Sequence, residues 1–202
     1  MAEELKVGDT IPPFFLKDHE GYDVTDEDVI GSPIVIYFYP KDDTPICTDE
    51  ACSFRDSMEK FDLLQTLVIG VSPDTVESHK KFIEKNKLEF SLLSDEKKDM
   101  ARMYGVLDDK EALVRATFVI DSQGVVKWVE KPVDVKGHAE RVLKALEEHC
   151  KEEVIKFDDF EQDYQDFLTG GEEMDLDEKK MEAEIMEEFG IKKGDIKGKK
   201  KK

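Results

Sequence analysis

The stretch PIVIYFYPKDDTPICTDEACSFRDSMEKF, residues 33–61, decides how the chain is organised. Residues 34–39 are β-branched or aromatic, and the run is too short for a helix, which predicts a buried strand. From Cys47 onward, apolar residues recur at steps of four, three, four and three as far as Phe61, which is helical spacing. We therefore predict a strand over 34–39, a loop over 40–46 and a helix over 47–61.

Cys47 lies in the first turn of this predicted helix. The first backbone N–H groups of a helix have no partner within the helix, and the helix dipole is positive at that end. Both effects favour a thiolate over a thiol. We therefore expect Cys47 to be a reactive cysteine.

Cys52 follows Cys47 by five residues. In a regular helix this separation places the two Cα atoms roughly 8.7 Å apart, whereas a disulfide requires a separation within about 6.8 Å. The two cysteines can bond only if the start of the helix unwinds. We therefore hypothesise a switch between a folded reduced form and a locally unfolded oxidised form.

Two other interpretations of the cysteine pair are open. Zinc-binding cysteines are usually spaced about two to four residues apart and need further ligands, but the four histidines are scattered singly. Two inert core thiols are a common arrangement, but that interpretation leaves the proline- and threonine-containing loop before Cys47 unexplained. We favour a redox pair and expect neither a metal nor a cofactor.

The stretch resembles the active-site signature of the peroxiredoxins, thiol peroxidases with a thioredoxin-like fold, through the pattern Pro40-x-x-x-Thr44-x-x-Cys47. Asp-Asp-Thr-Pro at 42–45 and Glu-Ala-Cys at 50–52 are similar to one subfamily, called bacterioferritin comigratory protein or peroxiredoxin Q. In that subfamily the resolving cysteine lies five residues after the peroxidatic one. The resemblance therefore implies that Cys47 is peroxidatic and Cys52 resolving.

One residue departs from that subfamily. Ile46 stands where the subfamily usually has glycine. A β-branched residue has no easy access to a positive φ, so we expect it to stiffen the loop.

The resemblance also implies a reaction. Hydrogen peroxide or a small organic hydroperoxide oxidises Cys47 to a sulfenic acid, which condenses with Cys52 to give a disulfide. Thioredoxin or a similar dithiol reductant then reopens the disulfide. The Thr44 hydroxyl can bind the peroxide and Pro40 restrains the loop.

Two charged residues complete the predicted site. Arg115, just before a strand over 116–120, resembles the peroxiredoxin arginine that faces the peroxidatic cysteine; the alternative is a solvated arginine at a strand end. Glu50 can orient this arginine through a charge-assisted pair, or it is an ordinary acid in the first turn of a helix.

The other segments predict one α/β domain over residues 1–150, which the resemblance identifies as a thioredoxin-like fold with a central mixed sheet flanked by helices. We expect a strand over 67–71, parallel to that over 34–39, and an edge-like strand over 90–93. Hairpins are expected over 14–24 and 115–129, and helices over 75–86, 95–104 and 134–150. We place His79 on a helix surface or half-buried, and Cys150 in packing.

Composition restricts the partners. The 202 residues carry a net charge of −19, which argues against nucleic acids and anionic membranes and favours a monomer or weak homodimer. No apolar run is long enough to span a membrane, and three cysteines fit a reversible disulfide in a reducing compartment. We therefore expect a cytoplasmic protein.

Residues 151–202 form a charged C-terminal extension that the resemblance does not cover. Residues 151–190 hold 16 acidic residues and four lysines, whereas the last twelve residues hold seven lysines and one acid. Apolar spacing predicts two short amphipathic helices before a lysine-rich tail. They either pack on the domain or a sister subunit, or bind a partner. The alternative function is therefore a redox sensor or binding module that acts through this extension.

Overall fold

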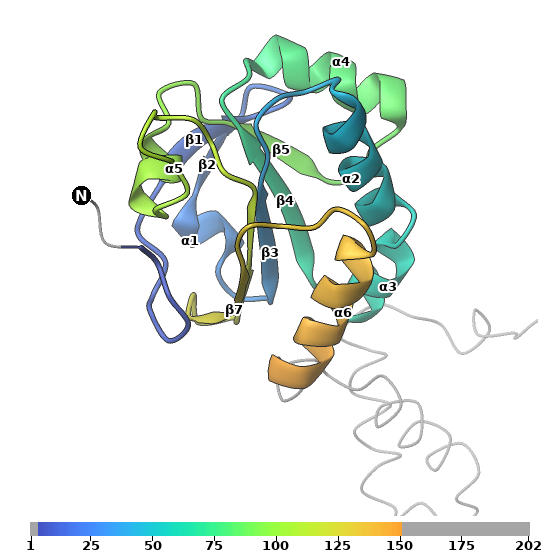
Figure 1. Ribbon diagram of the computed structural model, residues 1–202. Helices are drawn as coiled ribbons and strands as arrows, with labels where there is room; N and C mark the ends of the chain where they lie inside the picture. The colour runs from blue at the N-terminus through green and yellow to red at the C-terminus, as the bar shows by residue number, and fades with distance from the viewer. Residues whose placement is uncertain (1–3, 151–202) are drawn as a thin grey trace, which may run out of the picture. The chain divides into compact units, whose positions relative to one another are not determined.

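The apolar stretch over residues 34–39 lies in the middle of the sheet as β3 (Ile34–Phe38). All five residues of β3 are buried, because strands flank it on both sides and helices cover both faces (Figure 1). It pairs in parallel with β4 (Leu67–Ser72) and antiparallel with β6 (Ala116–Ile120). The predicted parallel arrangement of the first two core strands is confirmed.

The computed structural model describes residues 4–150, whose seven strands form one mixed sheet in the order β2-β1-β5-β4-β3-β6-β7. The remaining strands are β1 (Phe15–Asp18), β2 (Asp23–Thr25), β5 (Ser91–Ser94) and β7 (Val126–Glu130). The helices are α1 (Asp26–Val29), α2 (Pro45–Arg55), α3 (Met58–Leu63), α4 (Val76–Asn86), α5 (Asp99–Met103) and α6 (His138–His149). The predicted mixed sheet, flanking helices and both hairpins are confirmed.

Alternation along β3 divides the core into two layers. Val35 and Tyr37 belong to the cluster that includes residues of α2, α3, α4 and α6. Ile34 and Ile36 belong to the cluster that includes residues of α1 and α5. In Figure 1, α2, α3 and α6 accordingly lie on one side of the sheet and α1 and α5 on the other. The predicted site belongs to the first layer.

The prediction of an edge-like strand over 90–93 was wrong. β5 lies inside the sheet, parallel to β4 on one side and antiparallel to β1 on the other. Leu92 and Leu93 are both fully buried, as an interior strand requires. The sequence alone did not show that the N-terminal hairpin adds to this side of the sheet.

The predicted helix over 47–61 is in fact two helices. α2 begins two residues earlier, at Pro45, and ends at Arg55, while α3 begins at Met58. Asp56 and Ser57 separate them, and these residue types compete with the helix through local hydrogen bonds. The apolar spacing continues across the break, which is why it predicted one helix.

Two other helices are shorter than predicted. α5 begins at Asp99, although the carboxylate of Asp95 accepts hydrogen bonds from the backbone N–H groups of Asp99, Met100 and Ala101 at 2.8, 3.3 and 2.8 Å. α6 begins at residue 138, because Gly137 takes a left-handed conformation with φ of 68° immediately before it.

The predicted extension over 151–202, with its two amphipathic helices and lysine-rich tail, lies outside the described residues, so the boundary at residue 150 stays a prediction. Within residues 4–150, no helix is long and apolar enough to cross a membrane.

We predict that Gly70→Ala destabilises the fold. A Cβ at Gly70 would lie 2.6 Å from Leu92 Cδ2 and 2.8 Å from the Tyr37 ring. Overpacking of this kind costs about 1–3 kcal/mol, which urea unfolding measures. Leu67→Ala, at the 44% exposed start of the same strand, is the control and should cost less than about 1 kcal/mol. Equal losses in the two variants would contradict the packing argument.

Candidate active site

The start of α2 holds Cys47 at the carboxyl end of the central strand. Thr44 is the N-cap of α2 and Pro45 its first residue, a position where proline is favoured because its missing N–H is not needed. Cys47 is the third residue of the helix and its side chain is only 1% exposed. The prediction that Cys47 lies in the first helical turn is confirmed.

Arg115 joins Cys47 to Glu50. One guanidinium nitrogen, Nη2, donates to Cys47 Sγ at 3.0 Å, and the other, Nη1, pairs with Glu50 Oε2. The arginine side chain is 16% exposed and the glutamate is fully buried. A guanidinium in contact with the sulfur stabilises negative charge on it. The structure thus brings together three residues that the sequence predicts for the site.

His138, the first residue of α6, also faces Glu50. Its Nδ1 lies 3.1 Å from Glu50 Oε1, and both side chains are fully buried. The distance is that of an ion pair, but the contact does not have hydrogen-bond geometry. Glu50 Oε1 and His138 Nδ1 therefore have no hydrogen-bond partner among the described residues. The sequence did not single out this histidine, which lies within the amphipathic helix predicted over 134–150.

Thr44, Pro40 and Cys52 lie around this group. The Thr44 hydroxyl donates to the Lys41 carbonyl oxygen at 3.2 Å, which leaves its oxygen able to accept. Pro40 is exposed and follows the buried Tyr39. Cys52 is half-buried in α2 and, like the two other cysteines, it forms no disulfide in the part of the chain described.

We expected Ile46 to lie in the loop and to stiffen it, but the structure places this residue in α2. Ile46 is the second residue of α2, where the backbone is helical and needs no positive φ. Asp43 takes the left-handed conformation in this loop instead, with φ of 55°. The Ile46 side chain is 57% exposed beside the buried Cys47.

A buried network anchors the loop that precedes α2. The Asp42 carboxylate accepts hydrogen bonds from Tyr39 Oη at 2.8 Å and Ser78 Oγ at 2.7 Å, and it lies 2.9 Å from His79 Nδ1. His79 Nε2 faces the Leu93 carbonyl oxygen at 3.2 Å. Both ring nitrogens of His79 therefore face acceptors. Asp42 and His79 thus form a buried pair at ion-pair distance.

The prediction of a surface or half-buried His79 was wrong, because the side chain is fully buried. The sequence contained the signal: His79 shares helical spacing with Val76 and Ile83, and so lies on the apolar face. Its partner, Asp42, precedes it by 37 residues, so that local spacing did not indicate the pair.

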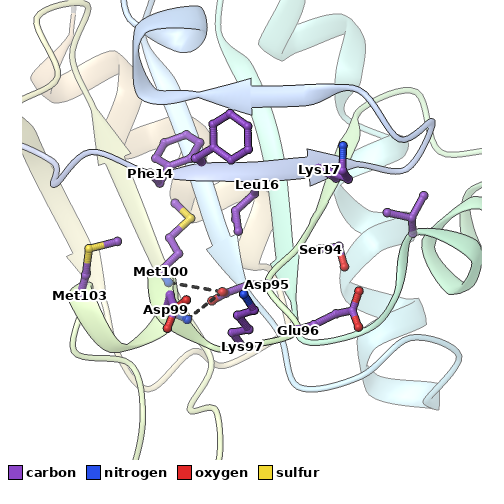
Figure 2. A pocket seen from close by; sticks show the side chains of 12 residues that line it. Phe14, Leu16, Lys17, Ser94, Asp95, Glu96, Lys97, Asp99, Met100 and Met103 are labelled. Carbon is purple, nitrogen blue, oxygen red and sulfur yellow. Dashed lines mark hydrogen bonds between the residues drawn. The ribbon is translucent and has the colours of Figure 1, made fainter.

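A pocket lies away from the thiol site, between β1, β5 and α5 (Figure 2). It has a volume of about 440 Å³, and its lining does not include Cys47, Glu50 or Arg115. Asp95 and Met100 line it, with Asp95 bonded to the backbone of α5. Within the described residues, no group of three acidic, histidine or cysteine side chains is placed to bind a metal.

A thiol in the first turn of a helix after the central strand, in contact with an arginine, is typical of thiol redox enzymes with a thioredoxin-like fold. Known proteins give the same result. The AhpC/TSA family matches residues 7–129. The chain therefore belongs to the AhpC/TSA family, as a thiol-dependent peroxidase of the peroxiredoxin Q/Bcp type.

Three relatives illustrate the match. Chloroplastic peroxiredoxin Q of Sedum lineare is 46% identical over 143 residues, 69% of this chain and 77% of that protein. Peroxiredoxin Bcp of Bacillus subtilis is 41% identical over 153 residues, 71% of this chain and 96% of that protein. The crystal structure of peroxidoxin BcpB from Mycobacterium tuberculosis is 33% identical with a TM-score of 0.68, covering 71% of this chain and 97% of that one.

We predict a pH dependence of stability from Asp42. Burial acts to raise the pKa of Asp42, but its hydrogen bond and charge interaction with His79 and the hydroxyls of Ser78 and Tyr39 hold it below the usual 3.8. A lowered folded-state pKa gives stability that is present above about pH 3.8 and is lost as the pH falls through the folded-state pKa. Asp42→Asn should therefore cost about 3 kcal/mol at pH 7 and lose less on acidification than the wild type.

Asp95 provides a matched control of opposite sign. Burial raises the pKa of Asp95 above the usual 3.8, despite three backbone hydrogen bonds. Its ionisation opposes folding above that pH, so Asp95→Asn should lose more stability on acidification than the wild type. Urea unfolding between pH 3 and pH 7 measures both, and the same change of slope in the two variants would contradict these assignments.

Proposed function

We propose that Cys47 is the peroxidatic cysteine and Cys52 the resolving cysteine of a peroxidase for hydrogen peroxide and small organic hydroperoxides. The observation that carries this proposal is the 3.0 Å contact between Arg115 Nη2 and Cys47 Sγ. A related structure, that of the Xanthomonas campestris bacterioferritin comigratory protein, is described for alkyl peroxide reduction. It is 34% identical with a TM-score of 0.66, and it supports the inclusion of organic hydroperoxides.

In the first step the Cys47 thiolate attacks one oxygen of the peroxide. The S–O bond forms, the O–O bond breaks, and the other oxygen leaves with the electron pair and takes a proton as water or an alcohol. Arg115 stabilises the thiolate and the charge that grows on the leaving oxygen. Thr44 accepts a hydrogen bond from the peroxide, while Pro40 restrains the loop.

In the second step the Cys52 sulfur attacks the sulfenic sulfur of Cys47. The S–S bond forms, and the sulfenic oxygen leaves as water with the protons of both groups. Both cysteines belong to α2, so a helical backbone keeps their Cα atoms roughly 8.7 Å apart. Residues 47–52 must therefore leave the helix before the disulfide can form.

A dithiol reductant of the thioredoxin class then reduces the disulfide by thiol exchange. We further infer a cytoplasmic monomer or weak homodimer that binds neither nucleic acid nor membranes. The net charge of −19 supports the inference about binding, and a reversible disulfide suits a reducing compartment.

We predict that replacing the two cysteines affects different steps of the reaction. Cys47→Ser should abolish peroxide consumption because the attacking sulfur is gone. Cys52→Ser should retain the first oxidation but lose turnover with thioredoxin and its reductase. Stopped-flow kinetics measure the first oxidation, and mass spectrometry should show a Cys47–Cys52 bridge in the oxidised wild type. Peroxide consumption by Cys47→Ser, or a bridge to Cys150, would overturn the assignment.

Arg115→Gln should slow the reaction of Cys47 with hydrogen peroxide by about 100-fold, a typical effect of removing one stabilising donor. Arg141→Gln, in which the altered arginine pairs with Glu130 instead, is the matched control and should react at close to the wild-type rate. Stopped-flow measurement in the Cys52→Ser background isolates this step. Equal rates for the two variants would remove Arg115 from the mechanism.

A further inference from the structure

The first layer of the core holds polar atoms that have no hydrogen bond among the described residues. Glu50 Oε1, His138 Nδ1 and His138 Nε2 are all of this kind, and the first two lie 3.1 Å apart. Buried polar atoms without hydrogen bonds are costly and rare, so each needs an explanation. The catalytic chemistry proposed above uses Arg115, which pairs with Glu50, but gives no role to His138.

The contact between α2 and α6 places His138 against the face of α2 that carries the thiol. Its ring meets the Phe54 ring edge to face, with centroids 5.1 Å apart. Phe54 follows Glu50 by four residues, so the two side chains lie on the same face of α2. The histidine thus contacts two successive turns of the helix that begins beside Cys47.

The carboxylate of Glu50 needs two partners. Arg115 binds Oε2, and His138 Nδ1 is the polar atom that the structure places against Oε1. A buried carboxylate held on one oxygen only can rotate, and Arg115 would move with it away from Cys47. A proton on Nδ1 gives Oε1 a donor after a small rotation of either side chain.

We propose that His138 is a positioning residue of the peroxidase. It holds Glu50, which in turn holds Arg115 in contact with Cys47. The inference rests on the proposed function of Cys47 and Arg115. It adds a role for α6, because the residue that completes the site comes from that helix.

The same contact between His138 and Glu50 also stabilises the folded form of α2. Glu50 lies between Cys47 and Cys52 in the chain, so the disulfide forms only after Glu50 leaves its buried position. Every interaction that holds Glu50 therefore favours the folded form that reacts with peroxide and opposes the form that makes the disulfide. Loss of the His138 contact should change the two steps in opposite directions.

The experiment compares His138→Leu with His138→Asn. Leucine removes the donor, whereas asparagine places an amide nitrogen close to the position of Nδ1. In a Cys52→Ser background, His138→Leu should react with hydrogen peroxide about tenfold more slowly, the effect expected when a carboxylate loses the donor that a small rotation of His138 supplies. His138→Asn should stay within about threefold of the parent. With Cys52 present, disulfide formation should be faster in His138→Leu than in the wild type.

The chain offers both a fluorescent probe of the two steps and a control variant. Trp128, the only tryptophan, packs against the core cluster that contains Cys47 and Phe54, so its fluorescence can follow both steps. Val142→Ala removes volume from the buried face of α6 without touching Glu50. This variant should lose folding stability, as expected when buried methyl groups are removed from a core, but it should react with peroxide at the parent rate.

Two results would overturn the proposal. One is a wild-type rate of peroxide reaction in His138→Leu; the other is a His138→Asn protein as slow as the leucine variant. If His138→Leu does not fold, His138→Asn is compared with His138→Gln, whose amide reaches the position of Nε2 and should be slow. Activity in Cys47→Ser would instead reject the proposed function, so the two failures are distinguishable.

Discussion

The site depends on the burial of one negative charge, the carboxylate of Glu50. A buried carboxylate is stable only beside a positive partner and hydrogen-bond donors, because the protein interior solvates charge poorly. Arg115 is that partner, and its planar guanidinium has a second nitrogen to spare, which contacts Cys47. The requirement to neutralise Glu50 therefore also aims the arginine at the thiol. It links α2, the residue before β6 and the start of α6, three segments that are distant in sequence.

A second buried pair, Asp42 and His79, anchors the loop between β3 and α2. Asp42 and His79 tie the chain just after β3 to α4, while Glu50 ties the chain after Cys47 to Arg115 and α6. The two anchors have different consequences for oxidation. In the proposed mechanism, formation of the Cys47–Cys52 disulfide releases Glu50, which lies between the two cysteines, but it does not require release of Asp42, which precedes them. The loop entrance can thus stay in place while the helix opens.

The sequence predicted those parts of the fold and site that local patterns encode. Cys47 was found because an apolar strand, a proline-containing loop and a helical period meet there. Arg115 was assigned through its resemblance to the peroxiredoxin arginine, because the strand after it alone fits a solvated arginine equally well. His79 and His138 were not assigned to the networks because their partners, Asp42 and Glu50, lie far away in the chain, and a lone histidine has no pattern of its own. β5 was misplaced for the same reason, since strand order depends on pairings that no local spacing records. Ile46 was misplaced by the two-residue error in the start of α2.

One helix has to meet two opposing demands. In the proposed mechanism α2 is folded to place the Cys47 thiol beside Arg115, and it unwinds to bring Cys47 to Cys52. An isolated helix of 11 residues is marginal in water, so α2 depends on its tertiary contacts, chiefly Glu50, Ala51 and Phe54. The break at Asp56 and Ser57 separates α2 from α3, whose Met58 and Phe61 remain packed in the core. Unwinding can therefore stop at the break, and its cost is set by the few buried residues of α2 rather than by the fold as a whole.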